Sequence, residues 1–387
     1  MIGIGVIGAG YWGPKHIRNF NELPGARATM VSDLDPNRLS TIQLQYPGIR
    51  TTTDFRQLLA SPDVDAVVVV TPVSTHARLA GEALQANKHV LVEKPLAATV
   101  AEAEHLIQLA KEHNRVLMVG HTFLYNPAVH ALRELVQGGS LGDIYYVDAQ
   151  RLNLGLFQRD INVMWDLAPH DISILLYVLG TQPLAVGASG NAYVQPGIED
   201  VAYMQLEFPH HIRASIHVSW LDPNKVRQIT VVGSKKMAVY DDVATLDKIR
   251  VYDKGVDVPA PTTSFGEFQL SYRYGEIRIP HVASTEPLRL ECQHFLECVQ
   301  RGSQPLSDGA QGLAVVRVLE TAQAALKTAS MLSMSTGRAP ATSGLSFDGN
   351  ANRQVSNTDG NGHAPGMNGH QVLVGATRDH HASSGGE

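Results

Sequence analysis

The sequence predicts an α/β fold in two parts: an N-terminal, doubly wound parallel sheet, then an α+β domain with a large, open, mostly antiparallel sheet. Two patterns lead to this prediction. Over residues 1–122, short apolar runs rich in β-branched residues alternate with stretches of helical spacing, which is typical of parallel strands buried on both faces. Over residues 202–240, apolar and polar residues alternate with a period of two, which is typical of strands with one packed face.

In the first part, each predicted strand is a short apolar run, and each predicted helix has apolar residues three or four positions apart. The expected strands cover residues 2–7, 28–32, 66–70, 89–92 and 116–119. The expected helices cover residues 11–20, 54–59, 75–86 and 99–113, the last beginning with Thr99 and Glu102 as a capping box. Strands that alternate with helices need crossover connections, and therefore form a parallel sheet.

The second part begins with an expected helix over 126–136. Its expected strands cover 202–208, 212–220, 227–232, 237–240 and 248–252, with a turn at 233–236. Two late amphipathic helices, 287–300 and 309–328, could pack on either part. We therefore expect a dinucleotide-type domain over 1–122, a substrate-binding domain over 123–334, and a disordered tail over 335–387, where large apolar residues are few.

Composition excludes several classes of protein. No apolar run approaches the roughly 20 residues that span a bilayer, so we expect no membrane segment. The first residues lack a basic region and a cleavage site, so the expected location is the cytoplasm. A net charge of −6 does not suit nucleic-acid binding. We also expect no metal, because the tail histidines are loosely spaced: His363, His370, His380 and His381.

A glycine motif directly follows the first predicted strand and opens a helix. Gly8 permits a tight turn, Gly10 lets the backbone approach a diphosphate, and Gly13 lets helix and strand pack closely, with Tyr11 and Trp12 between them. The helix N-terminus supplies N–H donors to the anion. This is the fingerprint of a Rossmann domain, although a glycine motif alone is more often an ordinary turn.

Asp33 makes the dinucleotide interpretation specific. It ends the second predicted strand, twenty residues past Gly13, where a carboxylate accepts hydrogen bonds from a ribose diol. The same carboxylate would repel a 2′-phosphate, so NAD is favoured over NADP, although Arg38 could soften that repulsion. The predicted cofactor is NAD.

Glu93, Lys94 and Pro95 follow another predicted strand and place an acid and a base at its carboxyl end. This is the edge where open α/β sheets bind ligands. Proline restricts the preceding residue, and a partly desolvated lysine can lower its pKa, which suits proton transfer. Taken alone, however, a lysine at a strand end is usually a solvated surface group.

Asp166 and His170 lie four residues apart at the start of an apolar helical run, so one helix face can carry both. A histidine that titrates near neutrality can take the proton of a carbinol as hydride leaves for nicotinamide. Asp166 can orient the histidine or hold a substrate hydroxyl, although capping of the helix explains it equally well.

In order along residues 1–330, these motifs resemble those of the Gfo/Idh/MocA oxidoreductases. The resemblance implies that Lys94 and His170 are the catalytic pair and that Asp166 contacts the substrate. It also implies a cofactor site bordered by the following residues: Gly8, Gly10, Tyr11, Trp12, Gly13, Asp33, Arg38, Thr71, Pro72, His76, Glu93 and Lys94.

A narrower resemblance is to bacterial UDP-N-acetylglucosaminuronate 3-dehydrogenases, over residues 120–127, 151–155, 165–171, 286–288 and 291–295. It implies oxidation at C3 of a UDP-linked sugar, giving a 3-keto sugar for transamination in surface-polysaccharide synthesis. Arg151, Asn153 and Arg159 are candidate donors to a uronate carboxylate or a diphosphate, with Asp166 and His170 beside them. Each arginine could equally be a surface residue.

Three alternatives stay open. The substrate could be another sugar or inositol, because specificity lies in loops rather than in the shared catalytic residues. The chain could be an NAD-dependent glycoside hydrolase, or a non-catalytic NAD-binding regulator, although such a regulator would be expected to lose Lys94 or His170. The resemblance also implies a homodimer or homotetramer through the open sheet, whose polar side carries Arg213, Ser215, His217 and Ser219.

Overall fold

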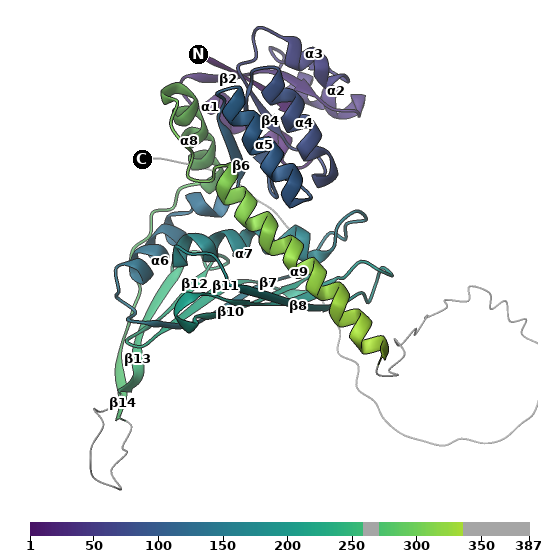
Figure 1. Cartoon of the computed structure of the whole chain (residues 1–387). Helices are drawn as coiled ribbons and strands as arrows, with labels where there is room; N and C mark the ends of the chain where they lie inside the picture. The colour runs from purple at the N-terminus through teal and green to yellow at the C-terminus, as the bar shows by residue number, and fades with distance from the viewer. Residues whose placement is uncertain (258–270, 336–387) are drawn as a thin grey trace, which may run out of the picture. The chain divides into compact units, whose positions relative to one another are not determined.

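The computed structural model describes residues 1–257 and 271–335 of the 387-residue chain (Figure 1). Sheet A has six strands, all parallel, in the order β3-β2-β1-β4-β5-β6. They are β1 (Ile2–Ile7), β2 (Ala26–Ser32), β3 (Arg50–Thr52), β4 (Ala66–Val69), β5 (His89–Glu93) and β6 (Leu117–Gly120). The predicted doubly wound parallel sheet is confirmed, and its order reverses between β1 and β4, where such sheets bind ligands.

Helices connect the strands of sheet A: α1 (Gly13–Glu22), α2 (Pro36–Gln45), α3 (Phe55–Ala60), α4 (Val73–Gln85) and α5 (Val100–Glu112). The predicted capping box is present at the start of α5, where Thr99 and Glu102 bind each other's backbone N–H groups. Helix α1 begins at Gly13, so Tyr11 and Trp12 belong to the turn before it rather than to the predicted helix.

Sheet B has eight strands in the order β14-β13-β12-β11-β7-β10-β9-β8. Only the β7–β10 pair is parallel, which agrees with the predicted, mostly antiparallel sheet. The strands are β7 (Ile144–Leu154), β8 (Ala185–Asn191), β9 (Val201–Glu207), β10 (Arg213–Ser219), β11 (Leu221–Gly233), β12 (Met237–Asp241), β13 (Ile249–Asp257) and β14 (Ser271–Arg278).

Helices α6 (Pro127–Gln137) and α7 (Val163–Leu179) pack on one face of sheet B and enclose its apolar core with part of α9 (Figure 1). In the described part of the chain, no helix covers the opposite face. Arg213, Ser215 and His217 point to that face, where the His217 ring stacks on Tyr203 with 4.2 Å between centroids. Ser219, predicted to join them, is buried instead.

The late helices pack on both parts of the chain. Helix α8 (Pro287–Arg301) packs on α1 and on the 3-10 turn η1 (Thr122–Tyr125), while α9 (Gly309–Ser335) contacts α5, α7 and β8. Figure 1 shows α9 running from the helices of sheet A to the edge of sheet B. Ser335, predicted to begin the tail, is the last residue of α9, and residues 336–387 lie outside the described part.

Within the described residues, no helix is both long and apolar enough to cross a membrane. The same residues contain no group of three or more histidine, cysteine, aspartate or glutamate side chains arranged to hold a metal ion. The predicted tail histidines lie outside these residues.

Candidate active site

The turn between β1 and α1 is built around three glycines. Gly8 has a φ of +106°, and a Cβ there would lie 2.3 Å from the Val70 carbonyl oxygen. A Cβ on Gly13 would lie 2.2 Å from the carbonyl oxygen of Gly8, so both glycines are required by the turn itself. At Gly10 a Cβ would meet only the Arg38 guanidinium, at 3.7 Å. The backbone there is open at a helix N-terminus, which fits the diphosphate of a dinucleotide.

Asp33 links the end of β2 to this turn. One carboxylate oxygen accepts the N–H of Ala9 at 2.6 Å, and the other accepts the N–H of Asp35 at 2.8 Å. The Arg38 guanidinium lies 3.6 Å from Asp33 and 3.6 Å from Asp35, so it is shared between two carboxylates. This sharing favours NAD, because Arg38 is not free to neutralise a 2′-phosphate.

Replacing Asp33 with alanine should weaken NAD binding by about 1–3 kcal/mol, because the ribose hydroxyls lose their acceptor. Fluorescence titration with NADH measures the change. Asp54→Ala is the matched control, since Asp54 also accepts a backbone N–H, from Arg56 at 3.0 Å, but lies outside the turn. Unchanged affinity in Asp33→Ala would mean that the ribose is held elsewhere.

His76 joins the loops that follow β4 and β5. Its two ring nitrogens lie 2.8 Å from the carbonyl oxygens of Thr71 and Pro95, and the side chain is buried. Burial lowers its pKa, so the ring is neutral and donates to only one of the two carbonyls. His76 was predicted to border the cofactor; its position indicates that it holds the Thr71-Pro72 loop against Pro95.

A buried histidine–carboxylate hydrogen bond lies behind the Lys94 backbone. His16 on α1 places Nε2 at 3.0 Å from Glu93 Oε1, while Glu93 Oε2 accepts the backbone N–H of Lys94 at 3.2 Å. Burial raises the pKa of Glu93, but the hydrogen bond and charge of His16, with the charge of Lys94, lower it overall. The glycine-turn helix and the end of β5 are thereby fixed to each other.

Lys94 and Asp166 are in contact, whereas the sequence analysis expects Asp166 to orient His170 or to hold a substrate hydroxyl. The Lys94 Nζ donates to the Asp166 carbonyl oxygen at 2.8 Å and lies 3.4 Å from Asp166 Oδ1. The indole N–H of Trp220 donates to Asp166 Oδ2 at 3.0 Å. Both carboxylate oxygens of Asp166 are thus fixed, one by the lysine and one by a buried tryptophan between β10 and β11.

His170 lies one helical turn beyond Asp166, with its Nδ1 buried and unpartnered among the described residues. Its ring packs edge-on against Phe123, 5.0 Å between centroids. Burial, followed by the positive charges of Lys94 and Arg151, lowers the pKa of His170 well below its usual value. Near neutral pH His170 is therefore a neutral imidazole, whereas the sequence analysis expects a histidine that titrates near neutrality.

Lys94 and His170 border one cavity of about 810 Å³. Its lining includes Glu93, Lys94 and His170, together with Tyr11 and Trp12 of the glycine turn. The lining also includes Asn126, just before α6, and four residues in or next to sheet B. These are Arg151 on β7, Lys225 and Arg227 on β11, and Asp242 just after β12. A cavity that joins the glycine turn to the lysine and the histidine can hold a cofactor and a small polar substrate together.

The three predicted anion donors are not placed as expected. Arg151 is buried and gives two hydrogen bonds to Asp171, at 2.8 and 2.9 Å, so its charge is already neutralised within the protein. Asn153 does not line the cavity, and Arg159 lines a second cavity of about 470 Å³. Of the three, only Arg151 reaches the catalytic cavity.

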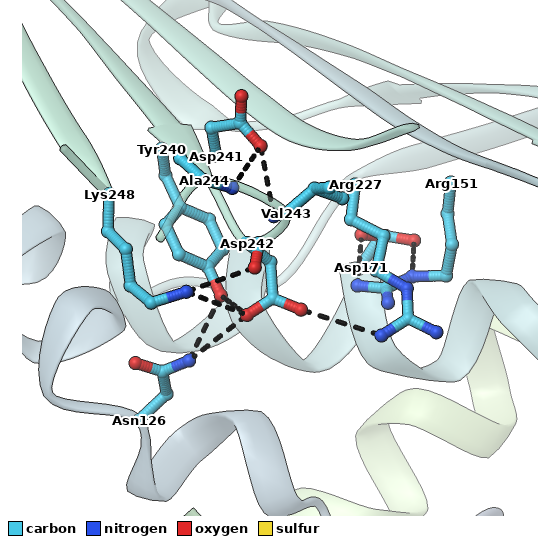
Figure 2. A network of polar contacts seen from close by, with 10 residues as sticks. All are labelled: Asn126, Arg151, Asp171, Arg227, Tyr240, Asp241, Asp242, Val243, Ala244 and Lys248. Carbon is cyan, nitrogen blue, oxygen red and sulfur yellow. Dashed lines mark hydrogen bonds and ion pairs between the residues drawn. The ribbon is translucent and has the colours of Figure 1, made fainter. Parts of the chain in front are cut away.

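A polar network beside Arg151 is centred on Asp242 (Figure 2). Asp242 accepts the hydroxyl hydrogen of Tyr240 at 3.0 Å, and Arg227 Nη1 lies 3.5 Å from its other oxygen. Asn126 donates to the Tyr240 hydroxyl at 3.1 Å, and Lys248 donates to the Asp242 carbonyl at 3.0 Å. The network fixes a carboxylate and a guanidinium in the cavity wall.

His121 directly follows β6 and is fully buried, and neither ring nitrogen has a partner among the described residues. Burial lowers its pKa to about 3. The unfolded chain takes up a proton here below about pH 6.5, whereas the folded chain resists protonation down to about pH 3. The stabilising contribution of neutral His121 is therefore present above pH 6.5 and is lost as the pH falls through this window.

Replacing His121 with glutamine should make the free energy of unfolding less sensitive to acid. His121 contributes a slope of up to about 1.4 kcal/mol per pH unit between pH 6.5 and 3, which urea titrations at several pH values would measure. Exposed His105, replaced in the same way, is the control. Equal slopes in both variants would contradict the role given to His121.

Residues 2–121 match the family described as the Gfo/Idh/MocA oxidoreductase family, NAD-binding Rossmann fold, and residues 129–239 match the Gfo/Idh/MocA C-terminal domain. The chain belongs to this family. The first part is accordingly an NAD-binding Rossmann domain, as the glycine turn and Asp33 predict. A solved structure of a putative oxidoreductase from Magnetospirillum magnetotacticum is 31% identical, with a TM-score of 0.71 over 83% of this chain and 99% of that one.

Family members with named substrates differ from one another. A UDP-N-acetylglucosamine 3-dehydrogenase of Acidithiobacillus ferrooxidans is 27% identical over 81% of this chain and 93% of its own length, and its solved structure matches with a TM-score of 0.70. Inositol 2-dehydrogenase 2 of Paenarthrobacter aurescens is 34% identical over 53% of this chain and 64% of its own length, just under two thirds. The family is shared, but the substrate differs between relatives.

Sequence reasoning missed several members of the site. His16 carried a signal, since it lies three residues after Gly13 on the helix that the glycine motif opens. Lys225, Arg227 and Asp242 carried none, because they reach the cavity only through the pairing of β7, β11 and β12.

Proposed function

We propose that this member of the Gfo/Idh/MocA family is an NAD-dependent dehydrogenase that oxidises a secondary hydroxyl of a sugar. The observation that carries the proposal is that Lys94, held by Asp166, and a neutral His170 line the same cavity as Tyr11 and Trp12 of the glycine turn. NAD supplies the hydride acceptor when bound. The residues of the chain then have only to hold the alcohol and remove its hydroxyl proton.

His170 is the proposed proton acceptor. Its imidazole is neutral, and one ring nitrogen lacks a partner within the described structure. As the C–H bond breaks and hydride leaves, the hydroxyl proton passes to this ring, which becomes an imidazolium. Lys94 donates a hydrogen bond to the same oxygen and stabilises the charge that develops there. Asp166 orients the lysine, because its own carboxylate is held by Trp220.

The proposed substrate is a UDP-N-acetylhexosaminuronate, oxidised at C3 in the synthesis of sugars for surface polysaccharides. Two observations support it: the motifs shared with uronate 3-dehydrogenases, and the relative named UDP-N-acetylglucosamine 3-dehydrogenase. The resulting 3-keto sugar would suit a following transamination. A second candidate is a free polyol, which the inositol dehydrogenase relative favours.

The carbon that reacts can be tested with UDP-N-acetylglucosaminuronate carrying deuterium at C3. The label should appear in the reduced cofactor, as mass spectrometry of the NADH would show. Deuterium retained in the sugar, alongside NADH formation, would place the oxidation at another carbon. A labelled substrate that releases UDP without net NADH would instead indicate an NAD-dependent glycoside hydrolase.

The open face of sheet B is the proposed interface of a homodimer or homotetramer. Tyr203 and His217 stack there, and Tyr203 is about half exposed. An aromatic pair on a helix-free sheet face suits burial against a second copy. Tyr203→Glu should lower the molar mass measured by light scattering, and an unchanged mass would exclude this face.

A further inference from the structure

The walls of the catalytic cavity carry more positive than negative side chains, although the chain as a whole has a net charge of −6. Six lysines and arginines line the cavity against three carboxylates. Four of the six have partners: Lys94 with Asp166, Arg18 with Glu286, Arg151 with Asp171 and, at longer range, Arg227 with Asp242. The other two, Lys15 and Lys225, have no carboxylate within 4 Å in the described structure.

Arg227 is the least satisfied of the paired cations. It lies directly opposite Arg151 in the β7–β11 ladder, on the face of sheet B that the helices cover. Two arginines in this position repel each other unless each has an anion. Arg151 has a close bidentate carboxylate, whereas the nearest contact of Arg227 with Asp242 is 3.5 Å, and its buried Nε has no partner among the described residues.

Lys225 reaches the same part of the cavity because the backbone of β11 is irregular there. The β7–β11 register shifts between Leu221 and Val226, so the residues between them leave the ladder and Lys225 lies at the cavity wall. Lys15, which also lines the cavity, lies over the Tyr11 ring, with Nζ 3.5 Å from the centroid. Contact with Lys15, followed by the charges of Arg227 and Lys225, lowers the pKa of the Tyr11 hydroxyl. Three cations thus gather around one exposed tyrosine.

We propose that Lys225 and Arg227 form the subsite that binds the anionic group of the sugar substrate, and that they select acidic or phosphorylated sugars over neutral ones. Asp242, fixed between Arg227 and Tyr240, accepts from a sugar hydroxyl beside it. The inference rests on the proposed function and assigns to β11 the anion recognition that the sequence suggested for Arg151, Asn153 and Arg159. The anion is a carboxylate or a diphosphate, which the same cations would bind.

The test uses Lys225→Met, Arg227→Gln and the double variant of the full chain. The matched control is Lys235→Met, because Lys235 is exposed on the β11–β12 hairpin and does not line the cavity. Steady-state kinetics would compare UDP-N-acetylglucosaminuronate, UDP-N-acetylglucosamine and myo-inositol. Titration with NADH would measure the affinity for the cofactor separately.

Each single variant should raise KM for the acidic substrate by about 10- to 100-fold, the effect of losing one charge-assisted hydrogen bond, with little change in kcat. NADH affinity and the Lys235→Met kinetics should stay at the wild-type values. A rise in KM confined to the uronate identifies the carboxylate as the bound group. An equal rise in KM for both UDP-sugars identifies the diphosphate. Unchanged KM, or a loss of NADH affinity instead, would overturn the proposal.

Calorimetric binding separates this inference from the proposed function. If the wild type oxidises no UDP-sugar, the dehydrogenase assignment to that substrate fails, yet binding of UDP and of UDP-N-acetylglucosaminuronate still tests the cations. Binding weakened by Lys225→Met and Arg227→Gln, but not by Lys235→Met, would support the subsite. No binding of either ligand to the wild type, or equal binding to all variants, would overturn it.

Discussion

Replacing Lys94 with alanine should lower turnover by about 10²- to 10⁴-fold, the usual contribution of a positioned group that assists proton transfer. Within the described residues, the Lys94 Nζ hydrogen-bonds only to Asp166, so little of the fold depends on it. NAD should still bind, because the glycine turn and Asp33 hold the other end of the cofactor. Single-turnover kinetics and NADH titration measure the two effects separately.

Lys94→Met is the matched variant, since it keeps the length of the side chain and removes only the charge. It should lose turnover as Lys94→Ala does, with a melting temperature close to that of the wild type. Turnover at the wild-type level in either variant would remove Lys94 from the reaction. Loss of turnover together with loss of NADH binding would assign Lys94 to the cofactor instead.

Replacing Asp171 with alanine should destabilise the fold by about 3–5 kcal/mol. The substitution leaves the Arg151 guanidinium buried without its bidentate carboxylate, opposite the second cation Arg227. A buried charge that has lost its partner is among the most costly results of a single substitution in a protein core. Urea denaturation followed by circular dichroism would measure the change.

Removing both charges together should recover most of that loss. In the double variant Arg151→Met with Asp171→Leu, no charge stays buried, and two apolar side chains of similar size can pack on α7 and β7. The double-mutant cycle gives the coupling between the two residues. A single Asp171→Ala variant within 1 kcal/mol of the wild type would contradict the account of this pair.

The sequence predicts much of sheet A because its strands are buried on both faces and therefore read as continuous apolar runs. It fails for β3, a three-residue edge strand without apolar residues, and for α2, in which only Leu39 and Ile42 are buried. The edge strands β8 and β14 were also missed. In sheet B it fails for β7, the strand beside both β10 and β11. There Arg151 occupies a core position, and a charged residue in the buried register hides the period of two.

The same difference between local patterns and tertiary pairing explains which site residues could be predicted from the sequence. Gly8, Asp33 and Lys94 could be predicted because each follows a strand of sheet A, where the topology alone brings residues to one edge. Asp166 and His170 lie on one helix turn, so their spacing was sufficient. The prediction for Arg151 failed because its partner, Asp171, comes from a helix that the pattern could not place over β7. The positions of Lys225 and Arg227 depend on a register shift that no local sequence pattern indicates.

The most direct test of the central claim is incubation of the purified chain with NAD and a panel of candidate substrates. The panel holds UDP-N-acetylglucosaminuronate, UDP-N-acetylglucosamine, glucose and myo-inositol, and the assay follows NADH absorbance and product mass. 2-Oxoglutarate is added in case NADH stays bound. The account predicts that the uronate loses two hydrogen atoms as NADH forms, and that Lys94→Met abolishes both signals. Unchanged masses for every substrate, with NAD bound, would contradict the assignment as a dehydrogenase of these sugars.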